Sequence, residues 1–155
     1  MDELKVLEGS NLDTTTQYIV IQVGNEAYGI NISYVETISR MVHITRVPKV
    51  QPYIKGVINL RGEVIPVLSL RLKMGLADDE ITKKSRIIIL KLEQYGMVGI
   101  VVDEVREVVT LEESQVEKVS ADNTAEHQLF VSSVGKCEAG LISLLDLNAV
   151  VAEKE

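Results

Sequence analysis

Short runs of apolar residues, separated by turn residues, begin at Gln17 and continue almost to the end of the chain. Four pairs of runs each flank a short turn, and each pair predicts a β-hairpin. The pairs are 18–23 with 27–30, 56–60 with 64–70, 86–92 with 97–102, and 129–134 with 140–145. Because many short strands recur at close spacing, the pattern predicts barrels or a sandwich.

The segments around these hairpins are less regular. Residues 31–38 carry apolar side chains at every third position, which indicates a short helical turn or an irregular strand. A loop follows, because Pro48 and Pro52 cannot donate hydrogen bonds to a strand ladder. For the same reason Pro66 favours an edge or a bulge in its strand, and Asp146 is placed to cap a short final helix.

Two stretches of the chain recur later in the same order. The alignments are 29–38 with 99–108 at an offset of 70, and 65–70 with 142–147 at an offset of 77. Matched positions include Gly29 with Gly99, Val35 with Val105, and Ile38 with Val108. Chance similarity between β-rich segments is the alternative. We favour two small β-barrels of related topology, each too small for a self-sufficient core, which share apolar surface where they meet.

Composition narrows the class of protein. The chain has 155 residues, about one domain, with 46% apolar residues and a net charge of −7. It contains neither an apolar run long enough for a membrane span nor the residue order of a signal peptide, and Cys137 is its single cysteine. A cytoplasmic protein is the simplest expectation. A nucleic-acid-binding barrel is an alternative, which the acidic charge and the scarcity of aromatic residues disfavour.

Catalytic or metal-binding groups are hard to assemble from this chain. His43 and His127 are far apart and lack partners at metal-ligand spacing. Asp103 and Glu104 would point to opposite faces of a strand, and Cys137 has no neighbouring base. We therefore expect no enzymatic activity, no cofactor and no metal.

The most informative segment is a glycine-framed hairpin, Gly56-Val-Ile-Asn-Leu-Arg-Gly-Glu-Val-Ile-Pro-Val-Leu-Ser-Leu70. It closely resembles the signature of the CheW family of bacterial chemotaxis coupling proteins. The resemblance spans about 17–150 and includes Val98-Gly-Ile-Val-Val-Asp-Glu-Val105 and Leu144-Leu-Asp-Leu147. The chain departs from the family pattern at Thr37, Ser69 and Cys137, where glutamate, aspartate and tryptophan are common.

This resemblance implies an all-β fold of two intertwined five-stranded SH3-like barrels with short helices. The expected organisation is a flexible lead-in over 1–16, a CheW-like domain over 17–150 made of two related barrels, and a tail over 151–155. It further implies a non-enzymatic adaptor, monomeric or weakly self-associating, that joins chemoreceptor cytoplasmic tips to the regulatory domain of a histidine kinase. Such an adaptor would be cytoplasmic and recruited to receptor arrays at the inner face of the membrane.

The resemblance also suggests which residues meet each partner. Ile32 and Val35 would present an apolar face to the kinase at the end of the first barrel, unless both belong to the core. The receptor would bind where the barrels meet, with Val108 near Arg61 and with Gly99 allowing close backbone approach. Alternatively, Gly99 is required by its strand, and Arg61 bridges the barrels through its guanidinium.

Overall fold

The computed structural model describes residues 15–119, 130–138 and 140–152, which form two β-sheets with four short helical segments. In spatial order the six-stranded sheet contains β8 (Glu104–Glu112), β1 (Thr15–Val23), β2 (Glu26–Asn31), β11 (Gly140–Leu145), β10 (Val131–Cys137) and β9 (Val116–Lys118). The five-stranded sheet contains β3 (Val35–Arg40), β6 (Arg86–Leu92), β7 (Gly96–Val102), β5 (Glu63–Ser69) and β4 (Ile54–Leu60). The helical segments are η1 (Ile32–Tyr34), α2 (Leu70–Lys73), η2 (Glu113–Gln115) and α3 (Leu147–Val151).

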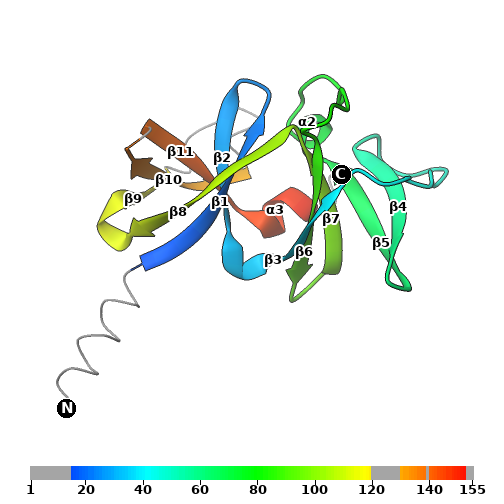
Figure 1. Ribbon diagram of the computed structural model, residues 1–155, viewed down its shortest axis with the longest axis horizontal. Coiled ribbons are helices and arrows are strands. Elements are labelled where there is room, and N and C mark those ends of the chain that lie inside the picture. Colours follow the sequence, from blue (N-terminus) through cyan, green and yellow to red (C-terminus); the bar gives the residue numbers. More distant parts are fainter. Residues whose placement is uncertain (1–14, 120–129, 139, 153–155) are drawn as a thin grey trace, which may run out of the picture.

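All four predicted hairpins are present, and the expected all-β class with short helices is confirmed. The chain crosses from one sheet to the other twice (Figure 1). The first crossing is η1, which leads from β2 into β3, and the second is a short bend that leads from β7 into β8. One sheet has six strands instead of five, since β9 follows η2 and pairs with β10. The predicted lead-in lies outside the described residues up to position 14, whereas Thr15 and Thr16 belong to β1.

Strands in the middle of both sheets are buried on both faces. In β6, Ile88 and Leu90 face a cluster between the sheets, whereas Ile87 and Ile89 face the interior of their own barrel. Such strands carry continuous apolar runs instead of alternating ones. The cluster between the sheets, here called the shared core, contains residues from β1, β2, β6, β7, α2 and α3. The predicted sharing of apolar surface between the barrels is therefore confirmed.

Strand registers agree with both repeat offsets. Gly29 pairs with Leu144 in the parallel contact between β2 and β11, and Gly99 pairs with Val67 in the parallel contact between β7 and β5. The helices that follow are capped in the same way. The Asp146 carboxylate accepts a hydrogen bond from Ala149 N, and the Ser69 hydroxyl accepts one from Leu72 N. Serine thus serves as the cap where aspartate is common in the family.

The expectation of an edge holds locally at Pro66, although the strand as a whole is not an edge. Its strand β5 lies between β4 and β7 and is not an edge. The parallel pairing with β7 begins only at Val67, so the ladder does not require a donor at Pro66 on that side. The proline is tolerated because it stands just before the point where the strand becomes central.

Candidate functional site

Two valines on the edge strand β8 face the shared core although they are three positions apart. Val105 lies opposite Ile21, and Val108 lies opposite Ile19. A register shift between these pairs leaves Arg106 as an extra residue, which is a β-bulge. Opposed residues of an antiparallel pair project to the same face, and both isoleucines belong to the shared core. The bulge therefore turns both valines towards the junction of the sheets.

The edge strand β3 repeats this arrangement in the other sheet. Val35 lies opposite Leu90 and Ile38 lies opposite Ile88, with Glu36 as the extra residue between them. Leu90 and Ile88 belong to the shared core, so Val35 and Ile38 also project towards the junction. The three-residue spacing that suggested a helical turn is explained at these two positions by a bulged strand.

The bulges in β3 and β8 are equivalent, since Glu36 and Arg106 obey the same offset of 70 as the aligned sequences. Val35 and Val105 pack against the shared core, whereas Ile38 is 40% exposed and Val108 is 50% exposed at its rim. Figure 1 shows β3 and β8 on either side of the junction, with α3 visible between them. We call the exposed residues Ile32, Ile38 and Val108 the junction surface.

Ile32 and Val35 do not form the single exposed face that the sequence suggested. Ile32 lies in η1 and is 36% exposed, whereas Val35 packs against the shared core. The location also differs from the expected end of one barrel, because η1 is the connection between the two sheets. The structure therefore places Ile32 at the junction of the barrels.

Gly99 is buried, and neighbouring side chains pack into the space that a side chain at this position would occupy. A Cβ atom at this position would lie 2.9 Å from Ile87 Cγ2 and 3.3 Å from Val67 Cγ2 inside the five-stranded barrel. A partner backbone has no access to such a position. The structure supports the alternative that the strand requires this glycine, and it corrects the expectation of a receptor contact at Gly99.

Arg61 is exposed at the turn between β4 and β5, where its backbone adopts a left-handed conformation with φ of 54°. Within the described residues its guanidinium makes no hydrogen bond or ion pair, so it does not bridge the barrels there. In Figure 1 this turn and β8 lie on different sides of the molecule. The structure thus does not bring Arg61 next to Val108, as the sequence had suggested.

The loop between β3 and β4 forms a second exposed apolar region at the far side of the five-stranded sheet (Figure 1). Its valines Val42, Val47 and Val50 are between 37% and 44% exposed, and we call them the distal surface. Two hydrogen bonds of 2.8 Å between Thr45 and Val57 fix the loop against β4. The close approach of this loop to β4 requires a glycine at position 56, because a Cβ atom on Gly56 would lie 2.1 Å from the Thr45 carbonyl oxygen.

A bidentate ion pair ties the two sheets together. Arg71 donates from Nε to Asp103 Oδ1 at 2.9 Å and from Nη2 to Asp103 Oδ2 at 2.8 Å. Asp103 also accepts a hydrogen bond from Gly24 N at 2.9 Å, so α2, the β7–β8 bend and the β1–β2 turn meet at one carboxylate. The hydrogen bonds from Arg71 hold the pKa of Asp103 below its usual value. Asp103 thus holds three segments of the chain together.

Other candidates for chemistry remain isolated. Among the described residues, no group of three or more His, Cys, Asp or Glu side chains is arranged to hold a metal ion. Cys137 lies at the end of β10 with its thiol near the Gly140 carbonyl, while His127 falls outside the described residues. In the same part of the chain, no helix has the length and apolar character needed to cross a membrane.

Comparisons with known proteins agree with this architecture. A model of the CheW-like domain family matches residues 17–155. The chain is 37% identical to the chemotaxis protein CheW of Bacillus subtilis (strain 168), with 92% of this chain and 90% of that protein covered. It is 28% identical to the chemotaxis protein CheW of Thermotoga maritima, with 88% of each chain covered.

A solved structure shows the same fold. The scaffolding protein TtCheW from Thermoanaerobacter tengcongensis superposes with a TM-score of 0.82 at 30% sequence identity, covering 90% of this chain and 94% of that chain. The family match, the relatives and the shared architecture of two interlocked SH3-like barrels lead to one assignment. The chain belongs to the CheW-like family of chemotaxis proteins.

Proposed function

We propose that this chain is a non-enzymatic cytoplasmic adaptor that couples the cytoplasmic tips of chemoreceptors to a chemotaxis histidine kinase. The observation that supports this most strongly is the family match over residues 17–155. The exposed apolar residues lie in separate regions, which an adaptor with two partners requires. Coupling then needs no bond chemistry. It requires only that the contacts of the adaptor with one partner depend on the signalling state of the other partner.

The receptor tip is proposed to bind at the junction surface. There Ile38 and Val108 stand exposed above a packed core, which supplies apolar contact on a rigid base. Ile32, assigned to the kinase from the sequence, joins this surface because η1 connects the two sheets. Arg61 does not belong to this surface because it lies at the β4–β5 turn. Gly99 does not belong to it because it is buried.

The regulatory domain of the kinase is proposed to bind at the distal surface. Val42, Val47 and Val50 lie in one loop at the end of the five-stranded barrel, away from the junction. That kinase domain is itself CheW-like, so a contact between barrel ends would be heterologous and could continue around a ring in an array. Recruitment of the adaptor to arrays at the inner face of the membrane follows from these two contacts.

Binding measurements with both partners test the proposal. Wild-type protein should bind a receptor tip fragment and the kinase regulatory domain in separate calorimetric titrations. Val108→Lys should weaken receptor binding at least tenfold and leave kinase binding unchanged, whereas Val47→Asp should do the reverse. Leu141 is an apolar residue that is 68% exposed in β11, so Leu141→Lys and Leu141→Asp are matched controls.

Each outcome has a definite meaning. Binding of wild type to neither partner would refute the adaptor function. An exchange of the two effects would keep the function and reverse the assignment of the surfaces. Loss of both partners in a variant that melts like wild type would show one common surface.

A further inference from the structure

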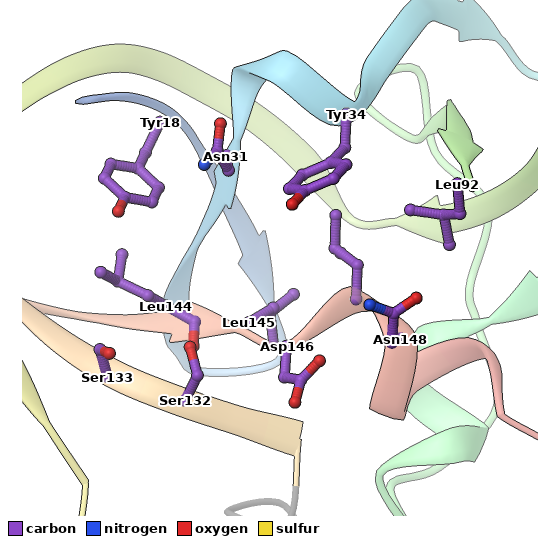
Figure 2. A pocket seen from close by; sticks show the side chains of 11 residues that line it. Tyr18, Asn31, Tyr34, Leu92, Ser132, Ser133, Leu144, Leu145, Asp146 and Asn148 are labelled. Atoms are coloured by element: carbon purple, nitrogen blue, oxygen red, sulfur yellow. The ribbon is translucent and has the colours of Figure 1, made fainter. Parts of the chain in front are cut away.

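A cavity of about 230 Å³ lies beside η1, where α3 meets the six-stranded sheet, and it is distinct from the two surfaces described above. Figure 2 shows the rings of Tyr18 and Tyr34 on one side of this hollow and Asp146 on the other, with Asn148 next to it. The lining residues come from both sheets and from the segments that join them. They are Tyr18, Asn31, Tyr34, Leu92, Ser132, Ser133, Leu144, Leu145, Asp146, Leu147 and Asn148.

The lining combines a single charge, many neutral oxygens and an aliphatic wall. Asp146 is its one charged residue among the described side chains, and neither lysine nor arginine contributes to it. Tyrosine and serine hydroxyls and two asparagine amides supply further acceptors. Four leucines supply the apolar part. The Asp146 carboxylate disfavours an anionic ligand, and the combination suits a cation carried on an aliphatic stem.

Several of these polar groups make few hydrogen bonds to other protein groups. Asp146 Oδ1 accepts a hydrogen bond of 3.2 Å from Ala149 N, and within the described residues Oδ2 accepts none. In that same part of the chain, the hydroxyl of Tyr34 and the side-chain amide of Asn148 make no hydrogen bond. Tyr34, Asp146 and Asn148 are exposed, so a cationic donor in the cavity would find a carboxylate oxygen, a hydroxyl and an amide oxygen that are bonded to no other described protein group, and it would displace only water from them.

Volume limits the size of the ligand. The cavity exceeds the about 150 Å³ that accommodates a benzene ring, and it is smaller than the about 300 Å³ at which typical cofactor pockets begin. One long side chain fits this volume. The size therefore points to a side chain presented by another protein.

We propose that this cavity binds the arginine side chain of a partner protein. A planar guanidinium offers five donors to dispersed acceptors and can stack on the Tyr34 ring, which the compact ammonium of lysine does less well. Ile32 of the junction surface lies two residues from Tyr34 in η1, so a segment bound at that surface passes close to the cavity. The identity of the partner rests on the proposed function, but the chemistry of the cavity does not.

The test uses a small probe in place of a partner. Nα-acetyl-arginine amide is titrated into the full-length protein while ¹H–¹⁵N correlation spectra are recorded, with Nα-acetyl-citrulline amide as the neutral isostere. We expect saturable shifts of the backbone amides of residues 31–34 and 145–148 and of the Asn148 side-chain amide. The citrulline probe should bind at least tenfold more weakly, because it lacks the charge.

Variants connect the shifts to the cavity. Asp146→Asn should weaken the arginine probe at least tenfold while α3 stays capped, since asparagine is an equally good cap. Tyr34→Leu, at an exposed residue, should also weaken it. Glu63→Gln removes one negative charge from the exposed start of β5, where no residue lines the cavity, and should bind the probe like wild type.

Three results would overturn the proposal: no saturable shift at probe concentrations of tens of millimolar, equal binding of the citrulline probe, or wild-type binding by Asp146→Asn. Free L-arginine separates the sources of the ligand. It carries an α-ammonium and an α-carboxylate that a residue within a polypeptide lacks, so tighter binding of the free amino acid than of the blocked probe would indicate a metabolite site and contradict a protein partner. Because no partner is present, failure here leaves the adaptor function standing.

Discussion

The core between the two sheets is much larger than the core inside either barrel. The shared core contains 19 buried residues, whereas the interior clusters of the five-stranded and six-stranded barrels contain six and four. Hydrophobic stabilisation scales with the apolar area removed from water. Most of the stability of this fold therefore resides between the barrels, which makes them cooperative halves of one unit and a rigid base for the junction surface.

Two neighbouring isoleucines of β6 test this difference most directly. Ile88 faces the shared core and Ile89 faces the barrel interior, and both are fully buried. We expect Ile88→Ala to cost about 4 kcal/mol and Ile89→Ala about 2 kcal/mol, within the usual range for such changes. The costs differ because the two cavities can be filled to different extents. The flexible methionines Met41 and Met97 adjoin the barrel cluster and can move into the cavity left by Ile89→Ala. The shared core is held between two sheets and cannot close its cavity in this way.

Urea denaturation gives both free energies of unfolding, and hydrogen exchange shows how far each effect extends. Ile88→Ala should lower protection in β1 and β2 as well as in its own sheet. Equal losses from the two variants, or an effect of Ile88→Ala confined to one sheet, would contradict the dominance of the shared core.

The ion pair between Arg71 and Asp103 is expected to add a smaller coupling between the halves. Asp103→Asn should cost about 1–2 kcal/mol near neutral pH, because the pair is 23% and 26% exposed and partly screened. The pKa of Asp103 is lowered in the folded state from 3.8. Its stabilisation is therefore present above about pH 4 and is lost as the pH falls through the folded pKa, so wild type and variant should converge in acid.

Thermal melts from neutral pH down through the folded pKa of Asp103 measure that convergence. Asp78→Asn is the control, because the more exposed Lys55–Asp78 pair joins two segments of the five-stranded half and should contribute less than about 0.5 kcal/mol. A constant difference between Asp103→Asn and wild type across the pH range would rule out the ionic contribution.

The equivalent glycines of the two barrels should respond differently to an added methyl group. In Gly99→Ala the new Cβ would meet Ile87 Cγ2, which branches directly from a stiff β-branched side chain. In Gly29→Ala it would lie 2.7 Å from Leu144 Cδ2, the end of a side chain that can rotate away. We expect a cost of about 1–3 kcal/mol for Gly99→Ala and less than about 1 kcal/mol for Gly29→Ala, measured by urea denaturation. The opposite order would show that the interior of the six-stranded barrel is the less adaptable one.

The smallest expected effect is a gain in stability at the β4–β5 turn. Arg61 and Gly62 have φ values of 54° and 84°, a conformation that asparagine followed by glycine adopts readily. Arg61→Asn should raise the free energy of unfolding by about 0.5–1 kcal/mol and change receptor binding by less than about 0.5 kcal/mol. A loss of receptor binding in this variant, with a normal melt, would return Arg61 to the receptor surface.

The sequence predicted the four hairpins, the equivalence of Gly29 and Gly99, and the cap at Asp146, because each depends on local chemistry or on a repeat. It placed Val108 beside Arg61 wrongly, since neighbours in different sheets depend on how the chain crosses over. Ile38 was aligned with Val108 but not recognised as a surface residue. The bulges at Glu36 and Arg106 explain this, because they break the alternation from which a strand face is inferred.

The pairing of Gly29 with Leu144 has a consequence for synthesis on the ribosome. These residues are separated by more than a hundred positions, so β2 is made long before its parallel neighbour β11 exists. At typical translation rates of about 5–20 residues per second, that interval lasts on the order of ten seconds. Throughout it, one side of β2 is an open strand edge that other chains could pair with. The arrival of β11 closes this edge, so the nascent protein remains open to aggregation at β2 until β11 has been made and can pair with it.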